Sequence, residues 1–343
     1  MKAWFLTEAS ETAGMGHLMR CMALAQALSE QYVECVFVVC AETIPFCMKR
    51  HDWRFMIQEI PSGLSETEQL QWLQEHVTVT NDDLIVLDSY KFSASFINQL
   101  SELPGSTVLF DDCNDRGTLN VRLIINSAGG ANALTYEQTA PKAKLCLGDK
   151  FRLLRQEFFS ELPLPLTSRR SLTLVMGGTD VKGLSLLFLK ALNERNVNMP
   201  VRLVATSDNN QLAEIKNYVQ KGQISVQLVI DCQDLASVFS NSLLTISAAG
   251  STQFELLAMQ CPSLLLVVAD NQLNAAKASE QQGWCQSFDF RQDMAISEVV
   301  ELADALWSKP ELLQTMYQQA EKHRDMQGTA RLLDQLAGLH EIE

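Results

Sequence analysis

Short apolar segments alternate with amphipathic helical segments along the first half of the chain. Five apolar segments predict β-strands, at residues 3–7, 33–39, 84–87, 107–110 and 121–125. Between the first two, residues 18–28 carry apolar side chains at the three-to-four-residue spacing of one buried helix face. Several strands end in polar residues, so we expect a parallel sheet with its functional edge at the carboxyl ends of the strands.

The same alternation restarts after a proline-rich stretch. Residues 163–170 (Pro-Leu-Pro-Leu-Thr-Ser-Arg-Arg) interrupt the pattern and are predicted to be a linker. Five further strands are predicted, at residues 172–176, 201–205, 226–230, 243–247 and 263–268. We therefore predict an α/β protein with two Rossmann-like domains, residues 1–162 and 171–343, facing a central cleft in which a small ligand binds.

Composition and net charge exclude some protein classes and some binding partners. Hydrophobic residues make up 47% of the 343 residues and charged residues 20%, which excludes a mostly disordered or fibrous protein. Because 27 Lys and Arg stand against 41 Asp and Glu, the net charge is −14, and no nucleic-acid partner is expected. An anionic small molecule would need a locally positive pocket.

Cysteine usage and the N-terminal residues indicate the compartment. The nine cysteines include no Cys-x-x-Cys pair and mostly lie in apolar segments, so we expect reduced core thiols. The N-terminus lacks the apolar core of a signal peptide, and no segment approaches 18 apolar residues. We expect a cytoplasmic protein without membrane insertion and without an obligate protein partner.

A glycine-rich turn after the first predicted strand carries the first candidate site, Gly14-Met15-Gly16-His17-Leu18-Met19-Arg20. Met19, and not a glycine, stands at the third glycine position of a dinucleotide fingerprint that starts at Gly14, which disfavours a nicotinamide-binding fold. His17 is predicted at the start of a helix, whose partial positive charge opposes protonation of the imidazole. A neutral imidazole can act as the general base that activates water. The alternative is a histidine that only caps the helix or hydrogen-bonds the backbone.

A second glycine turn follows a predicted strand of the second domain. After Gly250, the residues Ser251 and Thr252 are predicted to open a short helix. Unpaired N–H groups at that helix start, together with two hydroxyls, suit a diphosphate. The competing interpretation is a capping box, in which Thr252 and Glu255 stabilise the helix without any ligand.

Two further groups lie at predicted strand ends. The segment Gly177-Gly178-Thr179-Asp180 either brings backbone against a ligand or forms a tight turn in which Thr179 caps the next helix. Polar residues also gather at strand ends of the first domain, namely Asp88, Tyr90, Asp111, Asp112 and Asp115. Pairs of acids can hold magnesium, but aspartates at loop starts more often form turns or caps, so no metal site is predicted.

The first of these motifs resembles the Gly-x-Gly-His-x-x-Arg start of a family of sugar-nucleotide proteins with a GT-B-type fold. These are the UDP-2,4-diacetamido-2,4,6-trideoxy-β-L-altropyranose hydrolases of pseudaminic acid biosynthesis and the SpsG-like spore coat polysaccharide proteins. Further segments agree with this family in order and spacing, at residues 86–90, 111–112, 147–158, 177–180 and 251–272. Ser89 departs from the family pattern, in which a larger residue, often His, stands between Asp and Tyr.

The resemblance implies roles for individual residues. His17 would be the catalytic residue, with Tyr90 and Asn271 as groups that position the sugar or the water. Ser251 and Thr252 would hold the diphosphate. The remaining residues expected at the UDP-sugar site are Gly14, Gly16, Arg20, Gly177, Gly178, Thr179, Gly250, Gln272 and Glu255, the last on the ribose hydroxyls. No cofactor and no metal are implied.

The resemblance implies a hydrolase, in which water replaces UDP at the anomeric carbon with inversion. UDP is a good leaving group, so the carboxylate pair of ordinary glycosidases is not required. The alternative is a GT-B glycosyltransferase with a UDP-sugar donor, although the first half has no obvious basic amphipathic helix for a membrane-bound acceptor. A non-catalytic nucleotide-sugar sensor would keep Ser251 and Thr252 but would not need His17.

Overall fold

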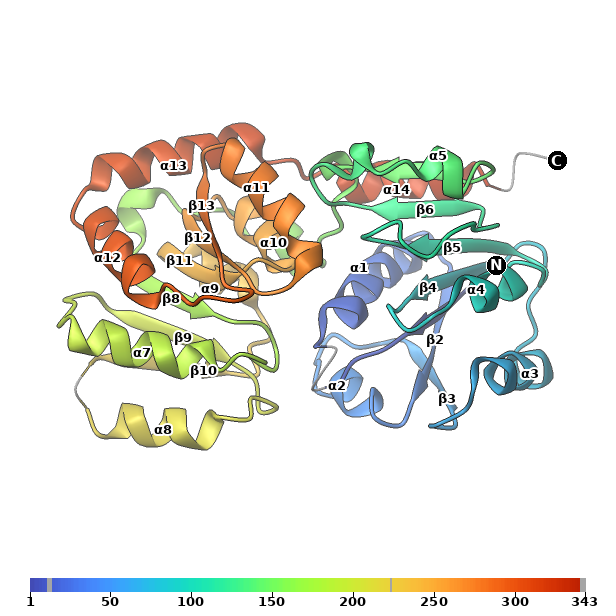
Figure 1. Cartoon of the computed structure of the whole chain (residues 1–343), viewed down its shortest axis with the longest axis horizontal. Helices are drawn as coiled ribbons and strands as arrows, with labels where there is room; N and C mark the ends of the chain where they lie inside the picture. The colour runs from blue at the N-terminus through green and yellow to red at the C-terminus, as the bar shows by residue number, and fades with distance from the viewer. Residues whose placement is uncertain (11–13, 223, 340–343) are drawn as a thin grey trace. The chain divides into compact units, whose positions relative to one another are not determined.

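The computed structural model describes residues 1–10, 14–222 and 224–339. The chain forms two compact units, of which the second is Glu157–Met326. The first consists of Met1–Gln156 and the C-terminal segment that begins at Gln327. Each unit has its own parallel sheet with helices packed against it (Figure 1). The prediction of two α/β units with Rossmann-like sheets is therefore confirmed.

The first unit contains a seven-stranded sheet in the order β3-β2-β1-β4-β5-β6-β7, with all neighbouring strands parallel. Its strands are β1 (Lys2–Thr7), β2 (Glu34–Cys40), β3 (Met56–Ile60), β4 (Leu84–Asp88), β5 (Ser106–Phe110), β6 (Leu123–Asn126) and β7 (Lys144–Leu147). The order reverses at β1, which lies between β2 and β4. In an open α/β sheet the carboxyl ends of the strands at such a reversal are where ligands bind.

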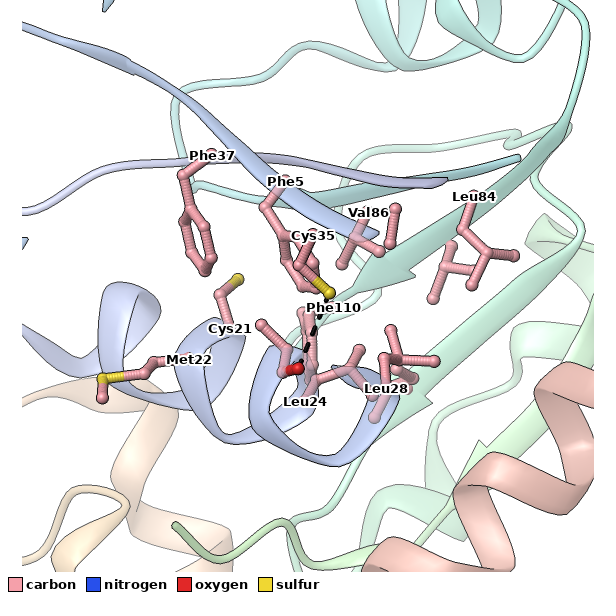
Figure 2. Close-up of a cluster of buried hydrophobic side chains, with 14 of the residues drawn as sticks. Phe5, Cys21, Met22, Leu24, Leu28, Cys35, Phe37, Leu84, Val86 and Phe110 are labelled. Carbon is pink, nitrogen blue, oxygen red and sulfur yellow. Dashed lines mark hydrogen bonds between the residues drawn. The ribbon is translucent and has the colours of Figure 1, made fainter. Parts of the chain in front are cut away.

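The helices of the first unit are α1 (Gly16–Glu30), α2 (Ile44–Met48), α3 (Glu66–His76), α4 (Ala94–Leu100), α5 (Tyr136–Thr139) and α14 (Gly328–Ala337). Alternate strand residues point to opposite faces, so Phe5 packs with α1 while its neighbour Trp4 packs in the cluster on the other side. Figure 2 shows side chains of α1 against those of β1, β2, β4 and β5. Phe5 stacks on Phe37 with ring centroids 4.7 Å apart, and the Cys35 thiol donates to the Ala25 carbonyl at 3.6 Å. This core fixes α1, and with it His17, against the central strands.

The C-terminal helix α14 belongs to the first unit. Leu332 and Leu336 are buried in the α1 cluster, and the Arg331 guanidinium donates to the Lys150 carbonyl at 2.9 Å. At Gly328 an added Cβ would lie 2.3 Å from the backbone carbonyl oxygen of Arg152, so only glycine allows this approach. The division thus differs from the predicted domains 1–162 and 171–343, because an amphipathic helix does not itself specify which sheet it covers. Residues 340–343 lie outside the described residues.

The second unit contains a six-stranded parallel sheet in the order β10-β9-β8-β11-β12-β13. Its strands are β8 (Ser171–Val175), β9 (Val201–Ala205), β10 (Val226–Ile230), β11 (Ser242–Ala248), β12 (Ser263–Val267) and β13 (Cys285–Asp289). Its helices are α6 (Glu157–Ser160), α7 (Leu184–Glu194), α8 (Leu212–Gln220), α9 (Leu235–Ser240), α10 (Thr252–Ala258), α11 (Leu273–Gln281), α12 (Ile296–Trp307) and α13 (Pro310–His323). Here the order reverses at β8, between β9 and β11. Among the described helices, none is long and apolar enough to cross a membrane.

Residues 163–170, the predicted linker, are a folded part of the second unit. Arg169 is 1% exposed, and its guanidinium donates to the carbonyls of Leu164 and Met259 at 2.9 Å and of Gln260 at 3.1 Å. These carbonyls satisfy the buried cation and tie the proline-rich segment to the end of α10. The chain passes between the units instead at Gln156 and at Met326.

The cysteines are thiols, as expected. All nine are free of disulfide bonds, and six of them are buried. Burial raises the pKa of the Cys35 thiol to about 11 and that of Cys47 to about 12. Thiols with such values carry almost no thiolate at neutral pH and are chemically inert.

Candidate active site

The loop after β1 delivers His17 to the carboxyl edge of the first sheet. Gly14 has a φ of +73°, a conformation that glycine adopts without strain, and it turns the chain into α1. Met15 is the N-cap residue and Gly16 the first residue of the helix, so His17 lies in the first turn. No side-chain capping bond forms at this helix start, and the His17 ring is engaged elsewhere. The interpretation of His17 as a helix cap is therefore wrong.

His17 is paired with Asp88, the last residue of β4. Strands β1 and β4 are neighbours, and their register places Asp88 beside Thr7, where the His17 loop begins. Nδ1 of His17 lies 2.6 Å from Oδ1 of Asp88, and the two residues are 6% and 1% exposed. With Nδ1–H donated to the carboxylate, a neutral ring carries its lone pair on Nε2. This is the tautomer that can take a proton from water.

Arg20, one helical turn after His17, is shared by two carboxylates. Its Nε and Nη2 donate to the two oxygens of Asp88 at 2.6 and 2.7 Å. Its Nη1 donates to both oxygens of Asp112 at 2.9 and 3.0 Å. The guanidinium also lies over the Phe110 ring, 5.0 Å from its centroid. These contacts join α1, β4 and the loop after β5 into one cluster.

The charge of Asp88 is stabilised within this cluster. Burial opposes ionisation, but Arg20 and His17 outweigh it and hold the pKa of Asp88 well below its ordinary value. Asp88 is therefore a carboxylate at neutral pH. Burial, together with this carboxylate, raises the pKa of the Cys21 thiol, which donates to Asp88 at 3.6 Å.

Tyr90 lies beside the imidazole. Its hydroxyl donates to Asp112, and its ring meets that of His17 edge-on, with centroids 4.6 Å apart and an interplanar angle of 78°. Tyr90 is nevertheless 47% exposed, so part of its side chain faces solvent next to His17. The structure therefore brings His17, Arg20 and Tyr90 together, as the sequence predicted for one site.

For Asp88 and Asp112 the sequence favours turns or caps over a magnesium pair, whereas in the structure both carboxylates bind Arg20. Asp111 does form the expected turn, because it accepts the N–H of Asn114 at 2.8 Å, and it also pairs with Arg116. The signal that distinguishes Asp88 is its place at the end of a strand that neighbours β1. Within the described residues no group of three His, Cys, Asp or Glu side chains is arranged to hold a metal ion.

Ser89, the residue that departs from the family pattern, forms a hydrogen bond at the same edge of the first sheet. Its hydroxyl donates to the Glu8 carboxylate at 2.6 Å, and Glu8 also pairs with Lys91. Ser89 is buried, so its small side chain allows Glu8, which follows β1, to occupy this position.

In the second unit, the loop after β8 contains the predicted site residues Gly177, Gly178 and Thr179. Gly177 has a φ of +81°, and the Gly178 carbonyl accepts a hydrogen bond from the Thr206 hydroxyl. Thr179 is buried but does not cap the next helix. The Asp180 carboxylate caps it instead, accepting the first two amides of α7 at 2.8 Å each.

The loop after β11, which is the neighbour of β8, holds the second glycine turn. Ser251 is the N-cap residue of α10 and Thr252 its first residue, and no side-chain capping bond forms there. Glu255 stands four positions after the N-cap, one beyond the position that a capping box requires, so that interpretation is wrong. Gln253 fixes the turn by donating to the Gly250 carbonyl at 3.1 Å.

Asn271 and Gln272 follow β12, the next strand of the sheet, in a single 3₁₀ turn, Asp270–Gln272. The Gln272 amide oxygen accepts the N–H of Val268 at 2.9 Å. A Cβ added to Gly250 would lie 3.9 Å from the Gln272 amide nitrogen, so these two predicted site residues are close together. The predicted residues of the second unit thus follow the adjacent strands β8, β11 and β12.

A search with protein-family models finds no match to the chain, whereas sequence relatives and solved structures of similar fold are found. The chain is 24% identical over 288 residues to the UDP-2,4-diacetamido-2,4,6-trideoxy-β-L-altropyranose hydrolase of Campylobacter jejuni, covering 83% of this chain and 98% of that protein. It is 21% identical over 281 residues to the spore coat polysaccharide biosynthesis protein SpsG of Bacillus subtilis, covering 79% and 78%.

Solved structures with a similar fold include named glycosyltransferases. The spinosyn rhamnosyltransferase SpnG matches with a TM-score of 0.67 at 13% identity, over 98% of this chain and 100% of that one. MurG of Acinetobacter baumannii matches with a TM-score of 0.61 at 15% identity, over 98% and 99%. The chain is therefore similar in sequence to the UDP-2,4-diacetamido-2,4,6-trideoxy-β-L-altropyranose hydrolase and to SpsG, and it has the two-unit α/β fold of the GT-B type.

Proposed function

We propose that the protein is a UDP-sugar hydrolase that cleaves the anomeric C–O bond of a UDP-linked 2,4-diacetamido-2,4,6-trideoxy sugar. The observation that carries the proposal is the buried pair of His17 and Asp88 at the strand-order reversal of the first sheet. The relative from Campylobacter jejuni bears the name of this reaction, and 98% of its length is matched.

In the proposed reaction, Nε2 of His17 takes a proton from a water molecule as that water attacks the anomeric carbon. The Asp88 carboxylate, bonded to Nδ1, stabilises the imidazolium that forms. The new bond joins the water oxygen to the sugar, and the electrons of the broken C–O bond leave with UDP. Attack opposite to the leaving group inverts the anomeric centre. Tyr90 and Asn271 are proposed to position the sugar or the water.

UDP binding is proposed for the second unit. Ser251 and Thr252, with the N–H of Thr252 at the start of α10, would hold the diphosphate, and Glu255 would bind the ribose hydroxyls. The absence of a side-chain cap at this helix start supports the assignment, as does its position after β11, beside the strand-order reversal at β8. The backbone of Gly177 and Gly178 after β8 would contribute from the neighbouring loop. The hydroxyls and amides would offset the charge of the diphosphate without a metal ion.

A GT-B glycosyltransferase is the second candidate, because solved structures of similar fold include the glycosyltransferase VinC and the rhamnosyltransferase SpnG. It would use the same base to activate an acceptor hydroxyl in place of water. The two functions differ in one measurable respect, which is whether UDP is released without an acceptor.

The experiment incubates the purified protein with UDP-linked 2,4-diacetamido-2,4,6-trideoxyhexoses and follows UDP release without acceptor and with EDTA. We expect turnover that EDTA does not reduce, and a fall of at least about 10²-fold in kcat for His17→Gln. His76→Gln is the matched control. The His76 side chain is exposed, and its ring forms a hydrogen bond with the Trp72 carbonyl of its own helix. Proton NMR of the sugar product gives the anomeric outcome. Turnover by His17→Gln at the wild-type rate would contradict the proposal, and release only with an acceptor would establish the transferase.

A further inference from the structure

The guanidinium of Arg20 has little capacity to bind a further anion. All three of its nitrogens already donate to Asp88 or Asp112, at 2.6 to 3.0 Å. Burial disfavours the cation, but Asp112 and Asp88 outweigh it and hold the pKa of Arg20 well above its ordinary value. With one positive and two negative side chains, the cluster has a net charge of −1 while His17 is neutral. A diphosphate would therefore meet repulsion there.

The same contacts fit a role toward the imidazole. Arg20 binds both oxygens of Asp88 as a fork, so the carboxylate cannot rotate away from Nδ1 of His17. Nη2 of Arg20 also lies 3.4 Å from Nδ1, close enough for its charge to oppose protonation of the ring. Proton uptake by His17 changes the net charge of the cluster from −1 to zero, so the two carboxylates stabilise the imidazolium when it forms during the reaction.

We propose that Arg20 is a positioning residue that holds Asp88 in line with His17 and places a positive charge beside Nδ1 of the ring, and that it does not bind the diphosphate. This inference rests on the proposed role of His17 as the base. The charged and titratable groups facing the pair are Arg20 and Cys21 from α1, Tyr90 after β4 and Asp112 after β5.

The kinetic test compares Arg20→Met with Arg20→Lys. Loss of the charge in Arg20→Met favours the imidazolium, so the acid limb of the kcat/KM profile moves to higher pH by about one unit. Loss of the fork lets Asp88 rotate and lowers kcat about tenfold or more, with little change in KM. Lysine keeps the charge but not the fork, so Arg20→Lys keeps the wild-type limb and lowers kcat. Arg195→Met is the control. It removes an exposed arginine that pairs with Asp304 at 3.0 Å, and it should change neither kcat nor the acid limb of the kcat/KM profile.

The opposite pattern would overturn the inference. If Arg20 binds the substrate, both variants raise KM about tenfold or more while kcat and the acid limb stay at their wild-type values. Arg20→Lys retains a cation between the two carboxylates, so its kcat and KM decide the positioning role even if Arg20→Met does not fold.

A second measurement does not depend on turnover. The ring signal of His17 is assigned by its loss in His17→Gln and is titrated by NMR in wild type and in Arg20→Met. We expect the midpoint to lie higher in Arg20→Met, and an unchanged midpoint would overturn the inference. A protein that hydrolyses no UDP-sugar yet shows this shift would contradict the proposed function while leaving the electrostatic role of Arg20 intact.

Discussion

Replacing Asp88 by Asn tests the proposed base without removing the imidazole. In the wild type, the two carboxylate oxygens accept from four donors, namely His17 Nδ1, two nitrogens of Arg20 and the Cys21 thiol. Asparagine offers one oxygen and one NH₂ group, so one of these donors must face another donor. Turning the oxygen toward Nε of Arg20 places the NH₂ against both Nδ1 of His17 and Nη2 of Arg20, which share one oxygen of Asp88 in the wild type. The ring then accepts at Nδ1 and carries its proton on Nε2, where the lone pair is needed.

The expected loss follows from this change of tautomer. General-base catalysis contributes about 10²–10⁴-fold, so kcat of Asp88→Asn should fall by that factor, or about 3–5 kcal/mol of transition-state stabilisation. KM should change little, because the proposed diphosphate site lies in the other unit. Steady-state UDP release between pH 6 and 9 measures both quantities.

Folding must be separated from catalysis in this experiment. Asp88 is 1% exposed and pairs with Arg20, so its neutralisation also destabilises the first unit, by up to about 3–5 kcal/mol. Circular dichroism and thermal melts identify the temperature at which the variant is still folded. Asp52→Asn is the matched control, because Asp52 pairs with Arg50 at 2.9 Å on the same unit. A folded Asp88→Asn protein with kcat within about threefold of wild type would refute the tautomer argument.

Three further predictions concern stability. Because the pKa of Asp88 is lower in the folded than in the unfolded state, its ion pairs stabilise the protein above about pH 4, and that contribution is lost as the pH falls through the folded value. Urea unfolding should show the wild-type advantage over Asp88→Asn shrinking below pH 4, and a constant difference would contradict this. Asp180→Ala removes two bonds to the start of α7 and should cost about 1–2 kcal/mol in urea unfolding, whereas Asp180→Asn, which keeps an acceptor, should cost less. Gly328→Ala forces a Cβ to within 2.3 Å of a carbonyl oxygen and should speed proteolysis of the C-terminal segment, and an unchanged cleavage rate would show that the contact relaxes freely.

The strands that the sequence did not predict lie at sheet edges. All ten predicted strands are present, whereas β3, β7 and β13 were missed, and each forms one edge of its sheet. Their sequences, Met-Ile-Gln-Glu-Ile, Lys-Leu-Cys-Leu and Cys-Gln-Ser-Phe-Asp, mix polar and apolar residues. An edge strand is covered less completely than a central one, so it lacks the continuous apolar run that marks a buried parallel strand.

The site was predictable only where its signal is local. His17 was found because two glycines and a helix start surround it within a few residues. Asp88 is 71 residues away, and its local sequence favours a turn or cap, because nothing near it indicates a partner. Its role becomes visible only once β4 is known to lie beside β1.

The sequence by itself therefore determined the two α/β units, the glycine turns at their strand ends and the histidine on the first turn. The tertiary structure decided that α14 covers the first sheet, that residues 163–170 belong to the second unit and that Asp88 and Arg20 accompany His17. The physical reason is the range of the interactions involved. Periodicity, capping and turn chemistry act over a few residues, whereas strand order and the partner of an apolar face depend on how distant segments pack.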